Sequence, residues 1–99
     1  MNIEEAEGIL KVELDRLMKE PYENLKKVMG GASRVQTFDI EGASGADYDV
    51  EIESIWAEKE GGNILVNVAV FDKGWASMVP VGGSFVVTAD DKILGKDNA

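Results

Sequence analysis

Residues 47–53 carry a carboxylate at every second position, a pattern that could form a binding site. The four acids alternate with Tyr48, Val50 and Ile52. In an extended chain, alternate residues point to one face, so neighbouring carboxylates would lie about 6.5–7 Å apart in a row. Such a row could bind a metal ion, imitate nucleic acid, attract a basic partner or simply face water. Its members, which we treat as a candidate acidic patch, are Asp47, Asp49, Glu51 and Glu53.

A calcium loop is the first of these alternatives. Ile52 stands where an EF-hand loop requires a glycine for its sharp turn. An EF-hand loop is also flanked by two helices, whereas the alternating pattern here predicts a strand. Ca²⁺ also needs oxygen ligands within about 2.6 Å, gathered by a curled loop. We therefore expect no metal site and no cofactor. The acids whose spacing imitates EF-hand ligands are Asp47, Asp49, Glu51 and Glu58.

The chain lacks two of the side chains that most often act in catalysis. Histidine and cysteine are both absent, which removes imidazole bases, thiolate nucleophiles and the usual zinc ligands. A catalytic carboxylate pair would need burial or a close like charge to raise one pKa toward neutrality. The glycine-containing segments 30–33, 42–45 and 82–84 match neither a phosphate-binding loop nor a nucleophile elbow, and they predict turns. We expect no enzymatic activity and assign no catalytic residue.

The net charge of −9 indicates which partners are disfavoured. Residues 39–60 hold eight acids against Lys59 alone, a net charge of −7. Nucleic acid and anionic membrane surfaces attract basic proteins, so we expect neither as a partner. The acidic start MNIEEAEG differs from a basic signal peptide, and no apolar run approaches the roughly 20 residues that span a bilayer. Because the chain has no cysteine and so no disulfide, we expect a cytoplasmic protein. The expected partner is a basic protein or a second copy of this chain.

The first third of the chain has helical periodicity. Apolar residues recur at intervals of three and four over residues 3–18, with Asn2 as the predicted N-cap. A second apolar set, Ile9, Val12 and Met18, predicts a broad buried face. Pro21 ends this helix and opens a short second one that stops at Gly30-Gly31, with Tyr22, Leu25 and Val28 or Met29 inward.

From residue 34 onward the apolar period changes to two, which predicts strands. We expect Pro80 and Gly82-Gly83 to interrupt the last strand region, and proline there suggests an edge or a bulge. A single domain over residues 1–99 is expected, with a frayed tail over 95–99. The predicted strands cover residues 34–40, 47–57, 63–71, 75–81 and 84–88.

Helices followed by strands with short connections predict an α+β fold, in which the N-terminal helix and a short second helix pack on a four- to five-stranded antiparallel meander. This order resembles the cystatin-like superfold in topology. The inhibitory Gln-x-Val-x-Gly loop of cystatins has no counterpart, because Val35-Gln36-Thr37 is a different sequence. Cysteine-protease inhibition is therefore not implied. The stretch from residue 47 to 85 is also similar to small bacterial proteins of no assigned activity.

A candidate interface follows from the same alternation. If Ile64 and the valines after it face the helix, intervening apolar residues must face the other way. Exposed apolar groups of some size mark interfaces or ligand grooves, unless sheet curvature or the C-terminal strand covers them. The first hypothesis is a non-enzymatic domain that self-associates as a homodimer through this group, with the acidic patch at its rim. The candidate interface residues are Ile55, Leu65 and Phe71.

The alternative hypothesis is a small-molecule or catalytic pocket between the helix and the concave sheet. It requires a cavity lined by Tyr48, Trp56 or Trp75, together with a buried carboxylate. Trp75 and Met78 are compatible with either face of the sheet. Tyr48 and Trp56 share a register with Val50, which predicts that both belong to the core.

Overall fold

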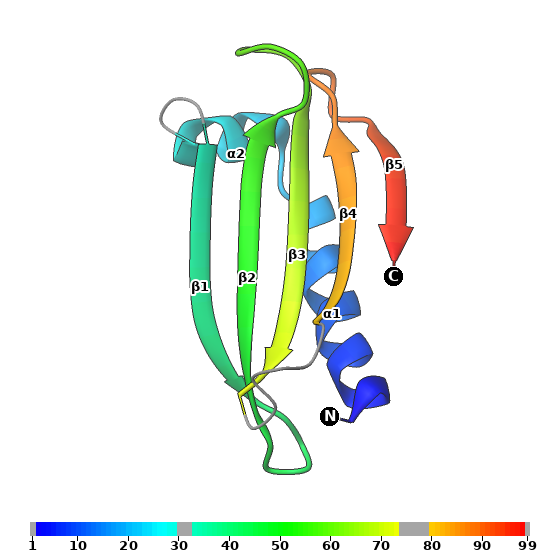
Figure 1. Ribbon diagram of the computed structural model, residues 1–99. Coiled ribbons are helices and arrows are strands. Elements are labelled where there is room, and N and C mark those ends of the chain that lie inside the picture. The colour runs from blue at the N-terminus through cyan, green and yellow to red at the C-terminus, as the bar shows by residue number, and fades with distance from the viewer. Residues whose placement is uncertain (1, 30–32, 74–79, 99) are drawn as a thin grey trace.

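A computed structural model describes residues 2–29, 33–73 and 80–98, with the side chains of residues 33 and 96–98 excepted. Two helices lie on one face of a five-stranded antiparallel meander, whose strands are neighbours in chain order (Figure 1). This confirms the predicted α+β fold, and the arrangement is consistent with a cystatin-like topology. The elements are α1 (Ile3–Met18), α2 (Tyr22–Met29), β1 (Ser33–Glu41), β2 (Asp47–Trp56), β3 (Ile64–Asp72), β4 (Val81–Val87) and β5 (Ile93–Asn98).

Helix α1 begins at its predicted cap, because the Asn2 side chain accepts a hydrogen bond from the Glu5 N–H at 3.0 Å. The helix lies chiefly over β3 and β4. Its buried face is narrower than predicted: Ile9 and Met18 are half-buried, but Val12 is 64% exposed. Val12 lines an open depression between α1 and β1. The buried apolar residues of α1 are Ala6, Leu10, Leu14 and Leu17.

Helix α2 follows Pro21 and closes one end of the core over β1 and β2. Of the two predicted inward positions at its end, Met29 is buried and Val28 is exposed. Tyr22 anchors the start of α2. Its backbone N–H donates to Asp91 Oδ1 at 2.7 Å, and its hydroxyl lies 2.7 Å from the carbonyl of Gly62.

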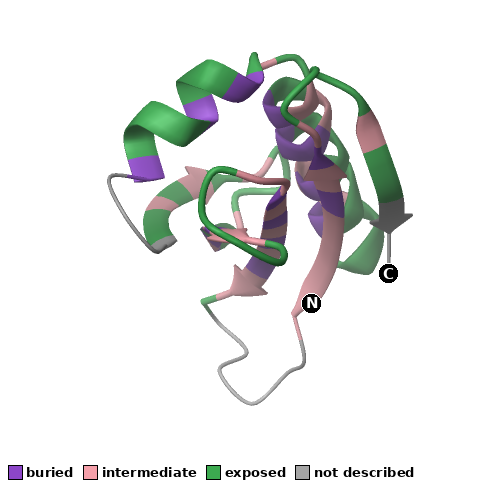
Figure 2. Ribbon diagram, turned by 90° about the horizontal axis from the view of Figure 1, so that it is seen from above, coloured by how far each residue is buried: buried purple, intermediate pink, exposed green. Residues whose placement is uncertain are grey.

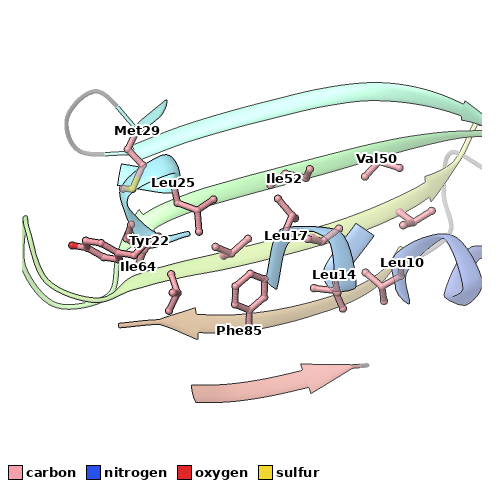
Figure 3. Close-up of a cluster of buried hydrophobic side chains, with 14 of the residues drawn as sticks. Leu10, Leu14, Leu17, Tyr22, Leu25, Met29, Val50, Ile52, Ile64 and Phe85 are labelled. Carbon is pink, nitrogen blue, oxygen red and sulfur yellow. The ribbon is translucent and has the colours of Figure 1, made fainter. Parts of the chain in front are cut away.

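The sheet is two-faced, as the alternation predicted (Figure 2). Residues directly opposite each other in antiparallel strands share a face, and the register places the buried residues of β2, β3 and β4 opposite one another beneath the helices (Figure 3). Trp56, predicted as core, is half-buried and packs against it. The buried sheet residues are Tyr48, Val50, Ile52, Ser54, Ile64, Val66, Val68, Val70, Phe85 and Val87.

The interruption predicted at Gly82-Gly83 is wrong. Gly82-Gly83 do not interrupt the chain but lie within β4, opposite Ala69 and Val68. Of the two alternatives expected for this region, an edge or a bulge, β4 is not an edge, since it pairs with both β3 and β5. Its pairing with β5 shifts register between Ser84 and Val86, as at a bulge. The expected frayed tail instead forms most of β5 up to Asn98. The strand predicted over residues 75–81 lies mostly outside the described residues, as do Trp75 and Met78.

Candidate interaction surfaces

An apolar row crosses the sheet face opposite the helices, near one end of β2. Ile55 lies directly opposite Leu65, Leu65 opposite Val86, and Val86 opposite Leu94. We call these four residues the apolar row. The first three are half-buried and Leu94 is 49% exposed. Both helices lie on the other face, so neither covers the row.

The predicted interface is only partly assembled by the fold. Ile55 and Leu65 are cross-strand neighbours, whereas Phe71 is six residues farther along β3 and lies opposite Asp49. At about 3.3 Å per residue, Phe71 is roughly 20 Å from Leu65. Val86 lies beside Leu65 instead, and Leu94 lies beside Val86. The alternation in β4 is consistent with Val86 on the outer face, but only the register with β5 brings Leu94 into the row.

The candidate acidic patch occupies the other end of the same face. All four of its predicted carboxylates lie on the outer face of β2, exposed or half-buried. The fold adds Asp39 from β1, directly opposite Asp49, and Lys73 bridges the two at 3.0 and 3.5 Å. Hydrogen bonding with Asp49 and with Lys73 lowers the pKa of Asp39. The hydrogen bond with Asp39 raises the pKa of Lys73.

The acidic patch lies along an extended strand, whereas a cation-binding loop bends around the ion to gather its oxygen ligands. Glu53, nearest to the apolar row, accepts a hydrogen bond from the Asn67 side chain at 3.2 Å. Within residues 2–29, 33–73 and 80–98, no group of three or more acidic side chains is placed to hold a metal ion.

Two open depressions lie between the helices and β1. The larger, about 400 Å³, is bounded by the end of α1, by α2 and by Gln36. The smaller, about 340 Å³, lies between the first half of α1 and the end of β1, and we call it the α1–β1 groove. Its walls are Glu5, Gly8, Ile9, Val12, Glu13, Ile40, Glu41, Gly42 and Ala43. Neither depression is lined by Tyr48 or Trp56, two of the three residues that the pocket hypothesis named. The third, Trp75, lies outside the described residues.

Glu13 is the buried carboxylate at this groove. Its side chain is 10% exposed, and one oxygen accepts two hydrogen bonds from the Arg16 guanidinium, at 2.8 and 3.1 Å. Its burial had no signal in the sequence, because Glu13 lies among the polar positions of α1. The ion pair with Arg16 satisfies the charge of this buried carboxylate.

Glu5, which also lines the groove, is the centre of a second polar cluster. Its carboxylate accepts hydrogen bonds from the Ser44 N–H (2.9 Å), the Ser44 hydroxyl (2.6 Å) and the Tyr48 hydroxyl (2.8 Å). The bond from the Ser44 side chain is the largest cause that lowers the pKa of Glu5. Burial, followed by the bond to Glu5, raises the pKa of Tyr48 to about 12. The cluster therefore ties the β1–β2 loop to α1 with an ionised acid and a neutral phenol.

Comparison of the chain with known protein families, curated proteins and solved structures found no match. In the part of the chain that the structure describes, no helix has the length and apolar character required to cross a membrane.

Proposed function

We propose that this protein is a non-catalytic interaction domain that self-associates through the apolar row. The observation that supports this most directly is the register, which gathers Ile55, Leu65, Val86 and Leu94 into one line across four strands. Four strands spaced by about 4.8 Å give a line of roughly 14 Å. A contiguous apolar surface on the face away from the helices is the kind of surface that interfaces use.

The separation of apolar and acidic residues favours a two-fold symmetric pair. A two-fold axis along the apolar row would place each row on its counterpart and reverse the strand direction of the second copy. The two acidic patches would then extend in opposite directions. This geometry limits the repulsion that a net charge of −9 on each copy imposes on association. The interface is small, so we expect a weak dimer that depends on protein concentration.

Sedimentation velocity across a wide concentration range tests this proposal with a matched pair of variants. Leu65→Asp introduces a charge into the apolar row, whereas Phe71→Asp introduces the same charge on the same strand and face, roughly 20 Å away. We expect the wild type and Phe71→Asp to increase in average mass with concentration, and Leu65→Asp to remain monomeric. Circular dichroism spectra and melting curves check that both variants fold.

Salt gives a second readout of the same interface. Added salt screens the repulsion between two acidic copies, so we expect the dimer to become tighter as NaCl is raised from about 50 to about 500 mM, a range over which the screening length shortens by about a factor of three. A wild type that stays monomeric at millimolar concentration would contradict the proposal. So would loss of association in Phe71→Asp with association retained in Leu65→Asp.

A further inference from the structure

Strand β1 is an edge of the sheet (Figure 1), and Ile40 and Glu41 at its end line the α1–β1 groove. We propose that this edge and groove together bind an extended peptide segment of a partner protein, in which apolar and basic residues alternate, as a sixth strand. This inference is independent of self-association, which uses the outer face of the sheet. It rests on the backbone of β1, the apolar walls of the groove and the charges around them.

The backbone groups that would pair with the peptide follow from the register. Bonds from Ala57 N to Asn63 O and from Lys73 N to Asp47 O show that odd-numbered residues of β2 pair with β3. Even-numbered residues of β2 therefore bond to β1, and their partners in β1 are also even-numbered. The remaining N–H and C=O groups of β1 point away from the sheet. They belong to Val35, Thr37, Asp39 and Glu41.

The α1–β1 groove can accept side chains of a strand added at this edge. An added strand lies about 4.8 Å beyond β1, and alternate side chains point to the helix side of the sheet. On that side, Ile9, Val12 and Ile40 offer apolar surface, and Val12 is 64% exposed. Gly8 faces open space, so the helix presents no side chain there that would fill the groove. The volume of about 340 Å³ accommodates one or two apolar side chains.

Charge selects the kind of peptide. Glu5, Glu13 and Glu41 surround the groove, and its walls include no lysine or arginine among the described residues. Glu13 is already paired with Arg16, which is not among the groove walls. Basic residues of the peptide alternate with those that enter the groove, so they lie on the outer face beside Asp39 and Glu41. Asp39 is bridged to Lys73, so Glu41 is the main attraction for a basic residue there, and an acidic peptide would be repelled.

The test uses a capped octapeptide in which valine and lysine alternate, labelled with a fluorophore and followed by anisotropy. Thr37→Pro removes one outward N–H and places the proline ring at the free edge, where a sheet tolerates proline. Thr37→Val is the matched control, because it keeps the N–H and the branched shape. We expect Thr37→Val to bind like the wild type and Thr37→Pro to lose affinity by about tenfold or more.

Two further arms examine the groove and the charge. Val12→Asn changes an exposed side chain, so the fold should be retained. We expect it to weaken peptide binding roughly several-fold, because the peptide loses an apolar contact with Val12. An octapeptide that alternates valine and glutamate should not bind. Amide hydrogen exchange should show new protection of the N–H groups of Thr37 and Asp39 when the lysine peptide is added.

The outcomes separate this inference from self-association. The measurements are repeated in Leu65→Asp, which should bind the peptide like the wild type because residue 65 lies on the other face. No binding of the lysine peptide at millimolar concentration overturns the inference, as does equal binding to folded Thr37→Pro. Loss of peptide binding in Leu65→Asp alone would place the peptide on the apolar row and would also overturn it.

Discussion

Replacing Tyr48 with phenylalanine removes one hydroxyl from the cluster that ties the β1–β2 loop to α1. Tyr48 is fully buried, and its hydroxyl donates to Glu5 Oε1 at 2.8 Å. The ring itself stays in the core, so the variant creates almost no cavity. The change therefore isolates one hydrogen bond to an ionised acid.

The expected magnitude follows from what remains after the substitution. A hydrogen bond to a charged group contributes about 1.5–3 kcal/mol to stability. Ser44 continues to donate twice to Glu5, so the carboxylate is not left without partners. We therefore expect the lower end, a loss of about 1.5 kcal/mol in the free energy of unfolding. For a domain of this size, that loss lowers the melting temperature by roughly 6–12 °C.

The pH dependence gives this prediction a sign. The folded pKa of Glu5 lies below its ordinary value of 4.5, so its contribution to stability is fully present above pH 4.5. The contribution is lost as the pH falls below 4.5 and through the folded pKa. Without the Tyr48 hydroxyl, the folded pKa moves back toward 4.5. The difference in stability between the wild type and Tyr48→Phe should therefore narrow as the pH is lowered from 4.5.

Tyr22→Phe is the matched control for this experiment, measured by urea denaturation at pH 7 and at several values below 4.5. The Tyr22 hydroxyl is also buried, but its acceptors are the neutral carbonyls of Gly61 and Gly62. We expect a loss of about 1 kcal/mol that does not change with pH. A Tyr48→Phe effect below about 0.5 kcal/mol at pH 7, or one as independent of pH as that of Tyr22→Phe, would refute the reasoning.

Two further substitutions test the contacts that hold the loops. Gly42→Ala would place a Cβ against the Glu5 carboxylate and 2.9 Å from Tyr48 Cε2. We expect the free energy of unfolding, measured with denaturant, to fall by about 1–3 kcal/mol. An unchanged free energy of unfolding would mean that the loop moves to make room for the methyl group. Asp91→Ala removes the acceptor of the Tyr22 N–H from a turn residue with a φ of 65°. We expect a loss of about 1–2 kcal/mol, with Asp91→Asn retaining most of the stability because asparagine tolerates this conformation and keeps an acceptor oxygen.

The regular elements could be predicted because their periodicity is strong and their ends carry local signals. Asn2 caps α1 as expected, and the alternation of β3 assigns its two faces correctly. The end of the chain could not be predicted in this way. Gly95 and the polar residues after it are typical of a tail, and they form a strand only because β4 offers them a pairing edge. Gly82 and Gly83 likewise lie in a strand because β3 pairs with them.

The candidate sites show the same division. The acidic patch follows from alternation within one strand, so its position on the outer face could be predicted. The apolar row combines residues from four strands, and only the register aligns Val86 and Leu94 with Leu65. The exposure of Val12 had no local signal either, because it results from the position of α1 over β3 and β4.

The helices, most of the strands, the burial of alternate residues and the concentration of negative charge in one segment could be inferred from the sequence, since each depends on neighbours along the chain. Three features depend on the folded chain: which apolar side chains meet on the outer face, where α1 leaves a groove beside β1, and the contact of Glu5 with Tyr48. The Glu5 cluster joins residues about 40 positions apart, and the apolar row joins four strands. Their contacts are set by strand register and helix placement, which are properties of the whole packed core.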